Sequence, residues 1–346
     1  MRPHLPKNLT GLEGAITVLL ANGGLYGDAN FRPIPLGANN QVFEIECKGS
    51  SALLKVYFRH QDDPRDRLGT EFKFYTFAWD QGIRSLPKPL ACDPLHSLGL
   101  YEFVKGRRLL AQEITGDQVR QALKFYQGLN LLKFTAEAQA LPVASEACFA
   151  IAEHFECVDQ RLDQLMKIDD SHDSHQEAAH FVRNDLLESW SQVKATAIKQ
   201  SEVLGLSLDT TITQYERCLS PSDFGFHNAI IGDDGNLYFI DFEYAGWDDP
   251  AKLVCDFFCQ PSLPVDLSYY DLFAETVVAD LPNPEIHLQR FALLMPVYQL
   301  KWCCVFLNDF LLVSDERRRF AYNGIEGGER KLCQLEKARQ ALQRIL

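Results

Sequence analysis

The chain has 346 residues, with 34 Lys or Arg against 47 Asp or Glu, so its formal net charge is −13. Hydrophobic residues make up 46%, including 23 Phe, which is enough for a packed core and excludes a wholly disordered chain. The acidic balance argues against a general nucleic-acid binder, because phosphate backbones are held by basic surfaces. Domains usually hold about 100–200 residues, so this length predicts two lobes.

The N-terminus and the cysteines favour a cytoplasmic protein. Met1–Pro6 is not followed by the apolar run and small-residue cleavage site of a secretory signal. We expect no membrane-spanning helix, because no stretch approaches the roughly 20 apolar residues that a bilayer requires. Ten cysteines occur without a Cys-x-x-Cys pair, which predicts reduced thiols and no disulfide framework.

Strand-like patterns dominate the N-terminal third. Residues 41–47 alternate polar and apolar side chains, Gly49 permits a turn, and residues 52–58 run back, which predicts a β-hairpin. Apolar residues at helical spacing interrupt this pattern once. The expected elements are a helix over 11–22, the hairpin, a helix over 67–79, and extended runs near Leu90 and over 99–104.

After Gly106, apolar residues recur every three or four positions, which indicates long helices. The expected elements are helices over 115–140, 146–167 and 175–204, strands over 228–231 and 237–242, and helices within 251–346. We therefore predict an α+β fold with two lobes. The small lobe, 1–104, holds an antiparallel sheet and one key helix, and the larger lobe, 105–346, is mostly helical.

Three features of the N-terminal third are weak when taken alone. Gly37, Asn39 and Asn40 precede a strand, where backbone N–H groups could face phosphates, although an ordinary turn is the commoner meaning. Lys55 lies in an apolar strand, where a Lys more often extends to a sheet edge. Glu71 follows 16 residues later on the expected helix, where it could equally face solvent.

The segment 220–246 carries a sharper signal. Asp223 and Asn228 form an Asp-x4-Asn pattern, and after a strand and a tight turn Asp241 ends a second apolar strand. Phosphoryl transfer uses this set: one carboxylate accepts the proton of the attacking hydroxyl, while an Asn and a second Asp hold Mg²⁺. Mg²⁺ prefers such hard oxygen ligands. The hairpin could therefore place Asn228 and Asp241 on opposite sides of one ion.

The run SDFGFHN followed by LYFIDFEYAGWDDP resembles the catalytic loop and metal-binding segment of the aminoglycoside phosphotransferase and choline kinase superfamily. That superfamily shares the protein-kinase-like fold, and the resemblance in motif order extends from Gly37 to Asp256. It implies Asp223 as the catalytic base, with Asn228 and Asp241 as Mg²⁺ ligands.

The resemblance also implies the nucleotide site. Lys55 would bind the α- and β-phosphates of ATP and would be held in place by Glu71. The segment after Tyr101 resembles the hinge between two lobes, whose backbone would bind adenine near residues 102–104, which are Glu102, Phe103 and Val104. Asp256 matches a buried Asp that braces the catalytic loop.

The chain departs from the family at two points. Pro221-Ser222 stands where the family has His-Gly before Asp223, and the phosphate loop is poor in Gly. These departures leave open a second hypothesis, a catalytically silent nucleotide-binding regulator of the same fold. A protein-substrate kinase is disfavoured, because the 14 residues between Asp241 and Asp256 leave little room for an activation loop.

Carboxylates and aromatic residues downstream of the second strand suggest an acceptor site. Glu243, Trp247 and Asp248, with Trp302 from a late helix, could attract amines and bind quaternary ammonium groups by cation–π contact. The same residues could instead be core side chains or helix caps. The sequence thus favours an ATP- and Mg²⁺-dependent kinase of a small cationic or polyhydroxylated acceptor, with no nucleic-acid or membrane partner.

Overall fold

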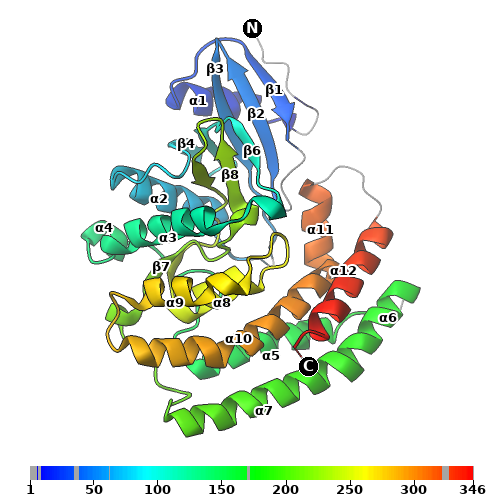
Figure 1. Cartoon of the computed structure of the whole chain (residues 1–346). Helices are drawn as coiled ribbons and strands as arrows, with labels where there is room; N and C mark the ends of the chain where they lie inside the picture. Colours follow the sequence, from blue (N-terminus) through cyan, green and yellow to red (C-terminus); the bar gives the residue numbers. More distant parts are fainter. Residues whose placement is uncertain are drawn as a thin grey trace.

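The computed structural model describes residue 6 and residues 9–34, 39–61, 63–169, 172–321 and 327–345. A five-stranded antiparallel sheet lies toward the N-terminal end, and most helices gather at the opposite end (Figure 1). This two-lobed α+β architecture confirms the predicted fold class.

The large sheet has the strand order β1-β2-β3-β5-β4. Its strands are β1 (Ala29–Pro33), β2 (Gln41–Cys47), β3 (Ser50–Val56), β4 (Pro89–Asp93) and β5 (Leu98–Glu102). The predicted hairpin is confirmed, since β2 and β3 pair with Val42 opposite Lys55. Its turn places Lys48 and Gly49 at φ of 48° and 83°, a conformation that Gly adopts without strain. The edge strand β1 was not expected from the sequence.

Helix α2 (Arg67–Asp80) connects the sheet to the helical region. It begins at Asp66, whose carboxylate accepts a hydrogen bond from the Gly69 N–H at 2.9 Å, as a helix N-cap does. Its buried Phe74 and Tyr75 rings lie 5.0 and 4.8 Å from the ring of Phe242. These ring contacts fix the position of α2 beside the segment around Phe242.

Helices make up most of the remaining chain (Figure 1). They are α1 (Glu13–Asn22) before the sheet, and then α3 (Gly116–Leu131), α4 (Ala136–Gln139), α5 (Ile151–Leu165), α6 (Asp173–Phe181), α7 (Leu187–Leu204), α8 (Pro250–Cys259), α9 (Tyr270–Val278), α10 (Pro284–Phe306), α11 (Leu312–Ala321) and α12 (Gly327–Leu342). A single helix over 115–140 was wrong, because Thr135 starts a new helix by accepting from the Ala138 N–H.

Two small sheets hold the segments that carry the phosphoryl-transfer motif. They are built from β6 (Gly106–Arg108), β8 (Ala229–Gly232) and β9 (Leu237–Phe239), and from β7 (Cys218–Ser220) and β10 (Gly246–Asp248). Because β8 pairs with β9 and β10 pairs with β7, the loops 221–228 and 240–245 are anchored at both ends. The two loops are therefore held next to each other.

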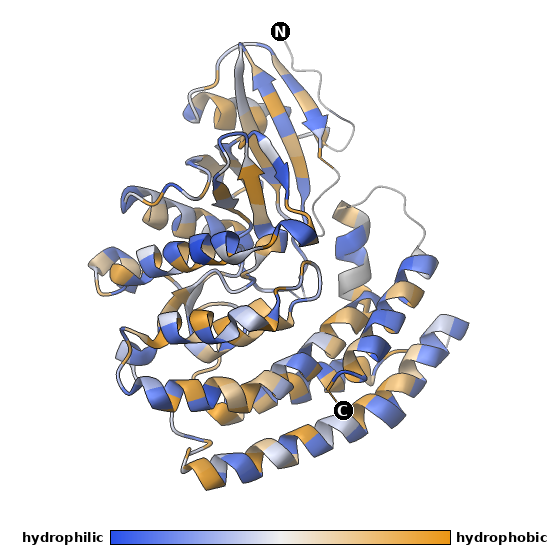
Figure 2. Ribbon diagram, in the orientation of Figure 1, coloured by the Kyte–Doolittle hydropathy of each residue, from blue (hydrophilic) through white to orange (hydrophobic). Residues whose placement is uncertain are grey.

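The apolar residues form two clusters. The smaller one fills the space between the large sheet and α1, with Ile16, Leu19, Phe43 and Leu54 fully buried. The larger one fills the helical region and includes the buried face of α2. Figure 2 shows hydrophobic and hydrophilic residues alternating along the strands of the large sheet, the pattern of a sheet with one buried face.

Helix α10 with the turn after it, residues 284–310, is the one segment of the described chain that is long and apolar enough to cross a membrane. Our expectation that no stretch reaches that length was therefore wrong. Of its most apolar window, 56% is buried inside the protein, where α10 contacts α5, α7, α8 and α12. The core helix of a soluble protein has these properties, and a cytoplasmic location stays a prediction.

Candidate active site

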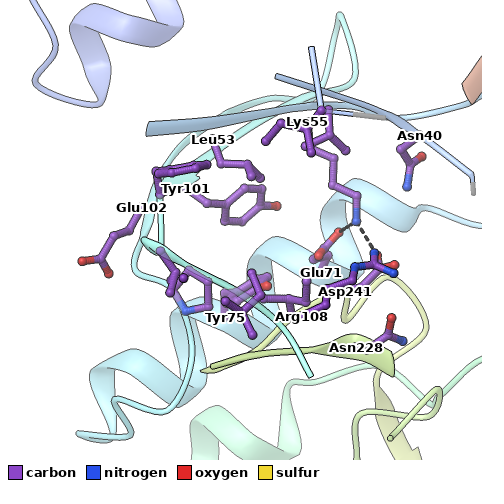
Figure 3. A pocket seen from close by; sticks show the side chains of 18 of the residues that line it. Asn40, Leu53, Lys55, Glu71, Tyr75, Tyr101, Glu102, Arg108, Asn228 and Asp241 are labelled. Carbon is purple, nitrogen blue, oxygen red and sulfur yellow. Dashed lines mark hydrogen bonds and ion pairs between the residues drawn. The ribbon is translucent and has the colours of Figure 1, made fainter. Parts of the chain in front are cut away.

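A cavity of about 370 Å³ opens beneath the large sheet, between β3, the segment 101–108 and β8 (Figure 3). We call it the nucleotide cavity. Its wall contains all the predicted nucleotide residues that the structure describes, namely Asn39, Asn40, Lys55, Glu71, Glu102, Phe103 and Val104. Gly37 lies outside the described residues. Apolar side chains such as Leu53 and Ile230 complete a wall suited to a flat ring.

Lys55 is the central cation of this cavity. Its Nζ donates to Glu71 Oε2 at 2.6 Å and to Asp241 Oδ1 at 2.5 Å, and Glu243 Oε2 lies 3.9 Å away (Figure 3). Burial alone would lower the pKa of Lys55, but the charges of Asp241, Glu71 and Glu243 outweigh it and hold that pKa well above its usual range. Lys55 is therefore a fixed positive charge.

Glu71 positions Lys55 from α2. Its Oε2 also accepts from the Tyr57 hydroxyl at 2.5 Å, and its Oε1 accepts from the Phe242 N–H at 3.2 Å. Burial raises the pKa of Glu71 to about 7; Lys55 opposes the rise, and the negative charges of Asp241 and its neighbours add to it. Glu71 thus links three elements, and its position is fixed by contacts on both carboxylate oxygens.

Glu243 is buried behind the wall of the nucleotide cavity and lines neither cavity, which corrects its predicted place in an acceptor site. Its oxygens accept from Asn39 Nδ2 at 2.8 Å and from Asn40 Nδ2 at 2.6 Å, and Arg67 Nη1 donates to it at 3.2 Å. Only 1% of Glu243 is exposed. Glu243 therefore holds the end of the predicted phosphate loop against the segment after Asp241.

The loop 221–228 brings the candidate base and its partners together. Asp223 Oδ1 lies 3.1 Å from His227 Nε2, and Asp223 Oδ2 accepts from Asn228 Nδ2 at 3.1 Å. Burial alone would raise the pKa of Asp223, but the charge and hydrogen bond of His227, the hydrogen bond of Asn228 and the charge of Lys252 lower it overall. Asp223 is therefore ionised at neutral pH and able to accept a proton.

The replacement of the expected His-Gly by Pro221-Ser222 has a structural counterpart at Ser222. This residue has φ of +67°, in the left-handed region that a Gly adopts more easily. Its N–H donates to Ser220 Oγ at 2.9 Å, and its own Oγ accepts from Lys252 Nζ at 2.9 Å. These two bonds hold the strained residue in place, so the loop keeps its form without the family's Gly.

Asn228 and Asp241 both line the nucleotide cavity, where Figure 3 shows them on the same side. Burial raises the pKa of Asp241; Lys55 opposes the rise, and Glu243 and Asp223 add to it. Asp241 also has φ of +69°, a strained conformation for a residue other than Gly. The amide oxygen of Asn228 and the carboxylate of Asp241, with further carboxylates nearby, match the donor set that Mg²⁺ prefers.

A second cavity of about 170 Å³ lies on the other side of the loop 221–228, and we call it the acceptor cavity. Its wall consists of Arg65, Ser145, Glu146, Arg161, Ser222, Asp223, Tyr244, Lys252, Asp256, Lys301, Trp302, Val305 and Arg317. Of the four residues predicted to line an acceptor site, Trp302 alone is among them.

Trp247 and Asp248 have structural roles in place of the predicted contact with an acceptor. Trp247 is 5% exposed, and its Nε1 donates to the Ala138 carbonyl at 3.0 Å. Asp248 is fully buried and accepts from Lys252 Nζ at 2.8 Å. The sequence placed both in the acceptor site, and the structure places both in the core.

Asp256 lies at the acceptor cavity and contacts α10. It accepts from Lys301 Nζ at 2.8 and 2.9 Å and from Trp302 Nε1 at 2.9 Å, and its Oδ2 lies 3.7 Å from Lys252 Nζ. Since Lys252 contacts Ser222, Asp256 reaches the catalytic loop through this lysine, so the predicted brace is indirect.

The sequence model of the phosphotransferase enzyme family (APH) matches residues 30–258. The matched residues include Lys55, Glu71 and the segment from Asp223 to Asp241, and they make up more than half of the chain. The chain belongs to this family. It is therefore a phosphotransferase by family, as the sequence predicted. No curated protein sequence matches the chain.

Solved structures share this fold at low sequence identity. Choline kinase LicA from Streptococcus pneumoniae is 14% identical with a TM-score of 0.58, covering 97% of this chain and 100% of its own. An ethanolamine kinase from Plasmodium vivax is 15% identical with a TM-score of 0.57, covering 92% and 83%. A spectinomycin phosphotransferase, solved with ADP and spectinomycin, is 14% identical with a TM-score of 0.57, covering 96% and 97%.

Sequence reasoning missed several residues that the structure places at the two cavities. His227 stands inside the motif run, four residues after Asp223, and that spacing could have drawn attention to it. Lys252 follows Asp248 by one helical turn, which is the spacing of an ion pair. Arg67 and Arg317 lie far from the motif in the sequence, and nothing in their local context points to a site.

Proposed function

We propose that this protein is an ATP-dependent small-molecule kinase that transfers the γ-phosphate to a hydroxyl group of a small acceptor. The contact between Asn228 and Asp223 carries the proposal. Asn228 lines the nucleotide cavity, Asp223 lines the acceptor cavity, and the Nδ2–Oδ2 distance between them is 3.1 Å. A phosphoryl group in one cavity would thus be close to a hydroxyl in the other.

Asp223 would act as the base, because its lowered pKa keeps it ionised at neutral pH. It would orient the acceptor hydroxyl and take up its proton as the new O–P bond forms and the bond between the γ-phosphorus and the β–γ bridging oxygen breaks. His227 and Asn228 each hold one of its carboxylate oxygens, which fixes the direction of attack. Catalysis would come mainly from this positioning.

Lys55 would bind the α- and β-phosphates, since it is a buried positive charge that points into the nucleotide cavity. Asn228 and Asp241 would hold Mg²⁺, which when bound neutralises charge on the phosphates. Glu102 turns its side chain away from the cavity, and its N–H donates to the Lys88 carbonyl at 2.8 Å (Figure 3). Adenine would therefore be bound by the backbone of Phe103 and Val104.

The test is ADP release by purified protein with ATP and Mg²⁺ across a panel of hydroxyl-bearing acceptors. Turnover with at least one acceptor is expected, and Asp223→Asn should lower kcat by about 10³-fold, because a positioned base contributes 10²–10⁴-fold. ATP binding should survive in this variant. Asp234→Asn, in the exposed turn after β8, is the matched control and should behave as wild type. Unchanged kcat in Asp223→Asn would contradict the assigned base.

The replacement of the family's His-Gly by Pro221-Ser222 favours one alternative, a catalytically silent nucleotide-binding regulator. That alternative expects ATP with Mg²⁺ to raise Tm while no acceptor causes ADP release. Acceptor-dependent ADP release that is lost in Asp241→Asn would argue against it. The left-handed backbone at Ser222, held by Lys252, supports the active form because it keeps Asp223 in the acceptor cavity.

A further inference from the structure

The acceptor cavity is rich in positive charge, although the chain as a whole is acidic. Among the described residues, its wall has five basic side chains, from Arg65, Arg161, Lys252, Lys301 and Arg317. It has three acidic ones, from Glu146, Asp223 and Asp256. The formal net charge of the whole chain is −13. This local excess of cations is the reverse of the carboxylate-rich site that an amine would require.

The carboxylates at the cavity wall already have cationic partners. Glu146 forms an ion pair with Arg161, and Asp256 accepts from Lys301 at 2.8 and 2.9 Å. Burial would raise the pKa of Glu146, but Arg161 and Lys301 lower it to about 2. These carboxylates are therefore ionised and neutralised within the protein. An amine-bearing acceptor would have to compete with ion pairs that are already formed.

The aromatic residues of the cavity are occupied in the same way. The Tyr244 ring has the guanidinium groups of Arg65 and Arg67 at 5.3 and 5.4 Å from its centroid. Trp302 directs its Nε1 to Asp256 at 2.9 Å. A quaternary ammonium group needs open aromatic faces for cation–π attraction, and at Tyr244 guanidinium groups already take that role.

Arg317 differs from the other cations at the wall. Its Nε, like that of Arg161, is buried with no hydrogen-bond partner, but unlike Arg161 it forms no ion pair with a carboxylate of the described residues. Burial lowers the pKa of Arg317; Tyr244 opposes that effect, and the positive charges of Arg67 and Arg65 add to it. A half-buried guanidinium without a counter-charge is stabilised by a ligand that supplies one.

Helix α11 holds Arg317 at the cavity by contacts with the large sheet. Gln41 Nε2 donates to the Phe320 carbonyl at 2.9 Å, and the Phe320 ring lies 5.4 Å from that of Phe58. Figure 1 shows α11 rising from the helical region toward the lower end of this sheet. Arg317 therefore reaches the cavity from a different element than Arg65, whose guanidinium is already paired with Asp63.

We propose that the acceptor carries an anionic group, a carboxylate or a phosphate, which Arg317 binds while the acceptor hydroxyl faces Asp223. The proposal rests on the function proposed above and names its substrate class. A planar guanidinium presents paired N–H donors that match carboxylate and phosphate oxygens. This replaces the cationic acceptor that the sequence favoured.

The first experiment compares ADP release for matched hydroxyl compounds that differ in charge. Glycerol, glycerate and glycerol 3-phosphate form one series, and glucosamine, glucose, glucuronate and glucose 1-phosphate form another. At least tenfold higher kcat/KM for anionic members is expected, and comparing the carboxylate with the phosphate arm separates the two chemistries. Equal or higher kcat/KM for choline, ethanolamine or glucosamine would overturn the proposal.

The role of Arg317 is tested on whichever anionic acceptor is turned over. Arg317→Gln should raise the acceptor KM by about 10–100-fold, the range for losing a charged hydrogen bond, while the KM for ATP stays within twofold. Arg317→Lys should recover part of the loss, and Arg120→Gln, an exposed site on α3, is the control for lost charge. An unchanged acceptor KM, or a rise confined to the KM for ATP, would overturn the assignment.

A binding readout keeps the proposal separate from the proposed function. Trp302 lines the cavity, so its fluorescence should change when glycerol 3-phosphate, glucuronate or inorganic phosphate is titrated, with KCl at equal ionic strength as the reference. The change should be absent in Trp302→Phe and at least tenfold weaker in affinity in Arg317→Gln. Binding without turnover would support the anionic site and argue against the proposed kinase activity. A response to choline but to none of the anions, or to nothing at all, would overturn the anionic site.

Discussion

The nucleotide cavity and the acceptor cavity meet at the loop 221–228, yet they are built in different ways. The first draws on short segments whose order follows the family motif, and Lys55 is surrounded there by Glu71, Asp241 and Glu243. The second is assembled from eight separate stretches between residues 65 and 317, with five basic and three acidic side chains. The residues of the family motif are thus encoded locally, while those of the acceptor cavity are spread over the chain.

Both walls hold more basic than acidic residues, but the carboxylates are arranged differently, because in the nucleotide cavity they gather around Lys55. Carboxylates in the nucleotide cavity suit a ligand that arrives with a divalent cation, because the ion bridges negative groups on both sides. The acceptor cavity offers guanidinium and ammonium groups directly, which suits a ligand that arrives without such an ion. Substitutions at single residues can test the two cavities separately.

The largest effect is expected for Lys55→Met. The substitution leaves Glu71 and Asp241 buried without their counter-charge, so the free energy of unfolding should fall by about 3–5 kcal/mol. The affinity for ATP should fall by about 100-fold, the loss expected for a buried charged contact. Urea unfolding and calorimetric titration measure the two quantities. Lys73→Met, on the exposed face of α2, is the control, and ATP affinity within twofold of wild type in Lys55→Met would contradict the role of this residue.

Two tryptophans distinguish the core from the acceptor cavity. Trp247→Ala removes a side chain that is 5% exposed, so it should lower the free energy of unfolding by about 3–5 kcal/mol and leave the acceptor KM unchanged. Trp302→Ala should raise the acceptor KM by about tenfold with a smaller loss of stability. Thermal unfolding and steady-state kinetics on both variants test this. A raised acceptor KM in Trp247→Ala with an unchanged acceptor KM in Trp302→Ala would instead favour Trp247 as the acceptor residue.

Asp249 gives a pH-dependent contribution to stability. This buried residue pairs with Arg290 and His154, which outweigh the effect of burial and lower its pKa to about 2. Because the folded-state pKa is below the usual 3.8, the contribution of about 2–3 kcal/mol is present above pH 4 and is lost as the pH falls toward 2. Asp249→Asn keeps a helix cap but removes the charge.

The free energy of unfolding of Asp249→Asn should therefore be lower than that of wild type at pH 7, and the difference should shrink below pH 4. Urea unfolding at pH 7, 5, 4 and 3 measures it. A difference that grows as the pH falls would contradict the lowered pKa.

The smallest effect is expected at Ser222, where φ is +67°. Ser222→Ala keeps the strained backbone and loses the hydrogen bond from Lys252, whereas Ser222→Gly loses the same bond but relieves the strain. The Gly variant should be more stable than the Ala variant by about 1 kcal/mol. Chemical unfolding of both compares them directly, and equal stability would mean that the left-handed backbone costs nothing here.

Much of the nucleotide cavity was predictable because its signals are local. The alternation of residues 41–47 gave the correct hairpin and helical spacing gave α2, and the family resemblance then implied that Lys55 and Glu71 meet. The three-residue strands β6, β7 and β10 were missed, because alternation cannot be recognised over so short a run.

The acceptor site was mispredicted for a different reason. A run of carboxylates and aromatic residues has the same appearance whether it faces a ligand or the core. The position of Glu243 is set by hydrogen bonds from Asn39, Asn40 and Arg67, which lie more than 170 positions earlier. Arg317 likewise is brought to the cavity only by the packing of α11 against the large sheet. Long-range packing decided these residues, and no short motif encodes it.

Helix α11 contributes Arg317 to the acceptor cavity, and none of its described side chains lines the nucleotide cavity. Under the proposed function, Arg317 would therefore influence which molecule is phosphorylated without touching the residues that bind the phosphoryl donor. Variation confined to Leu312–Ala321 would then retune the acceptor and leave the donor site unchanged.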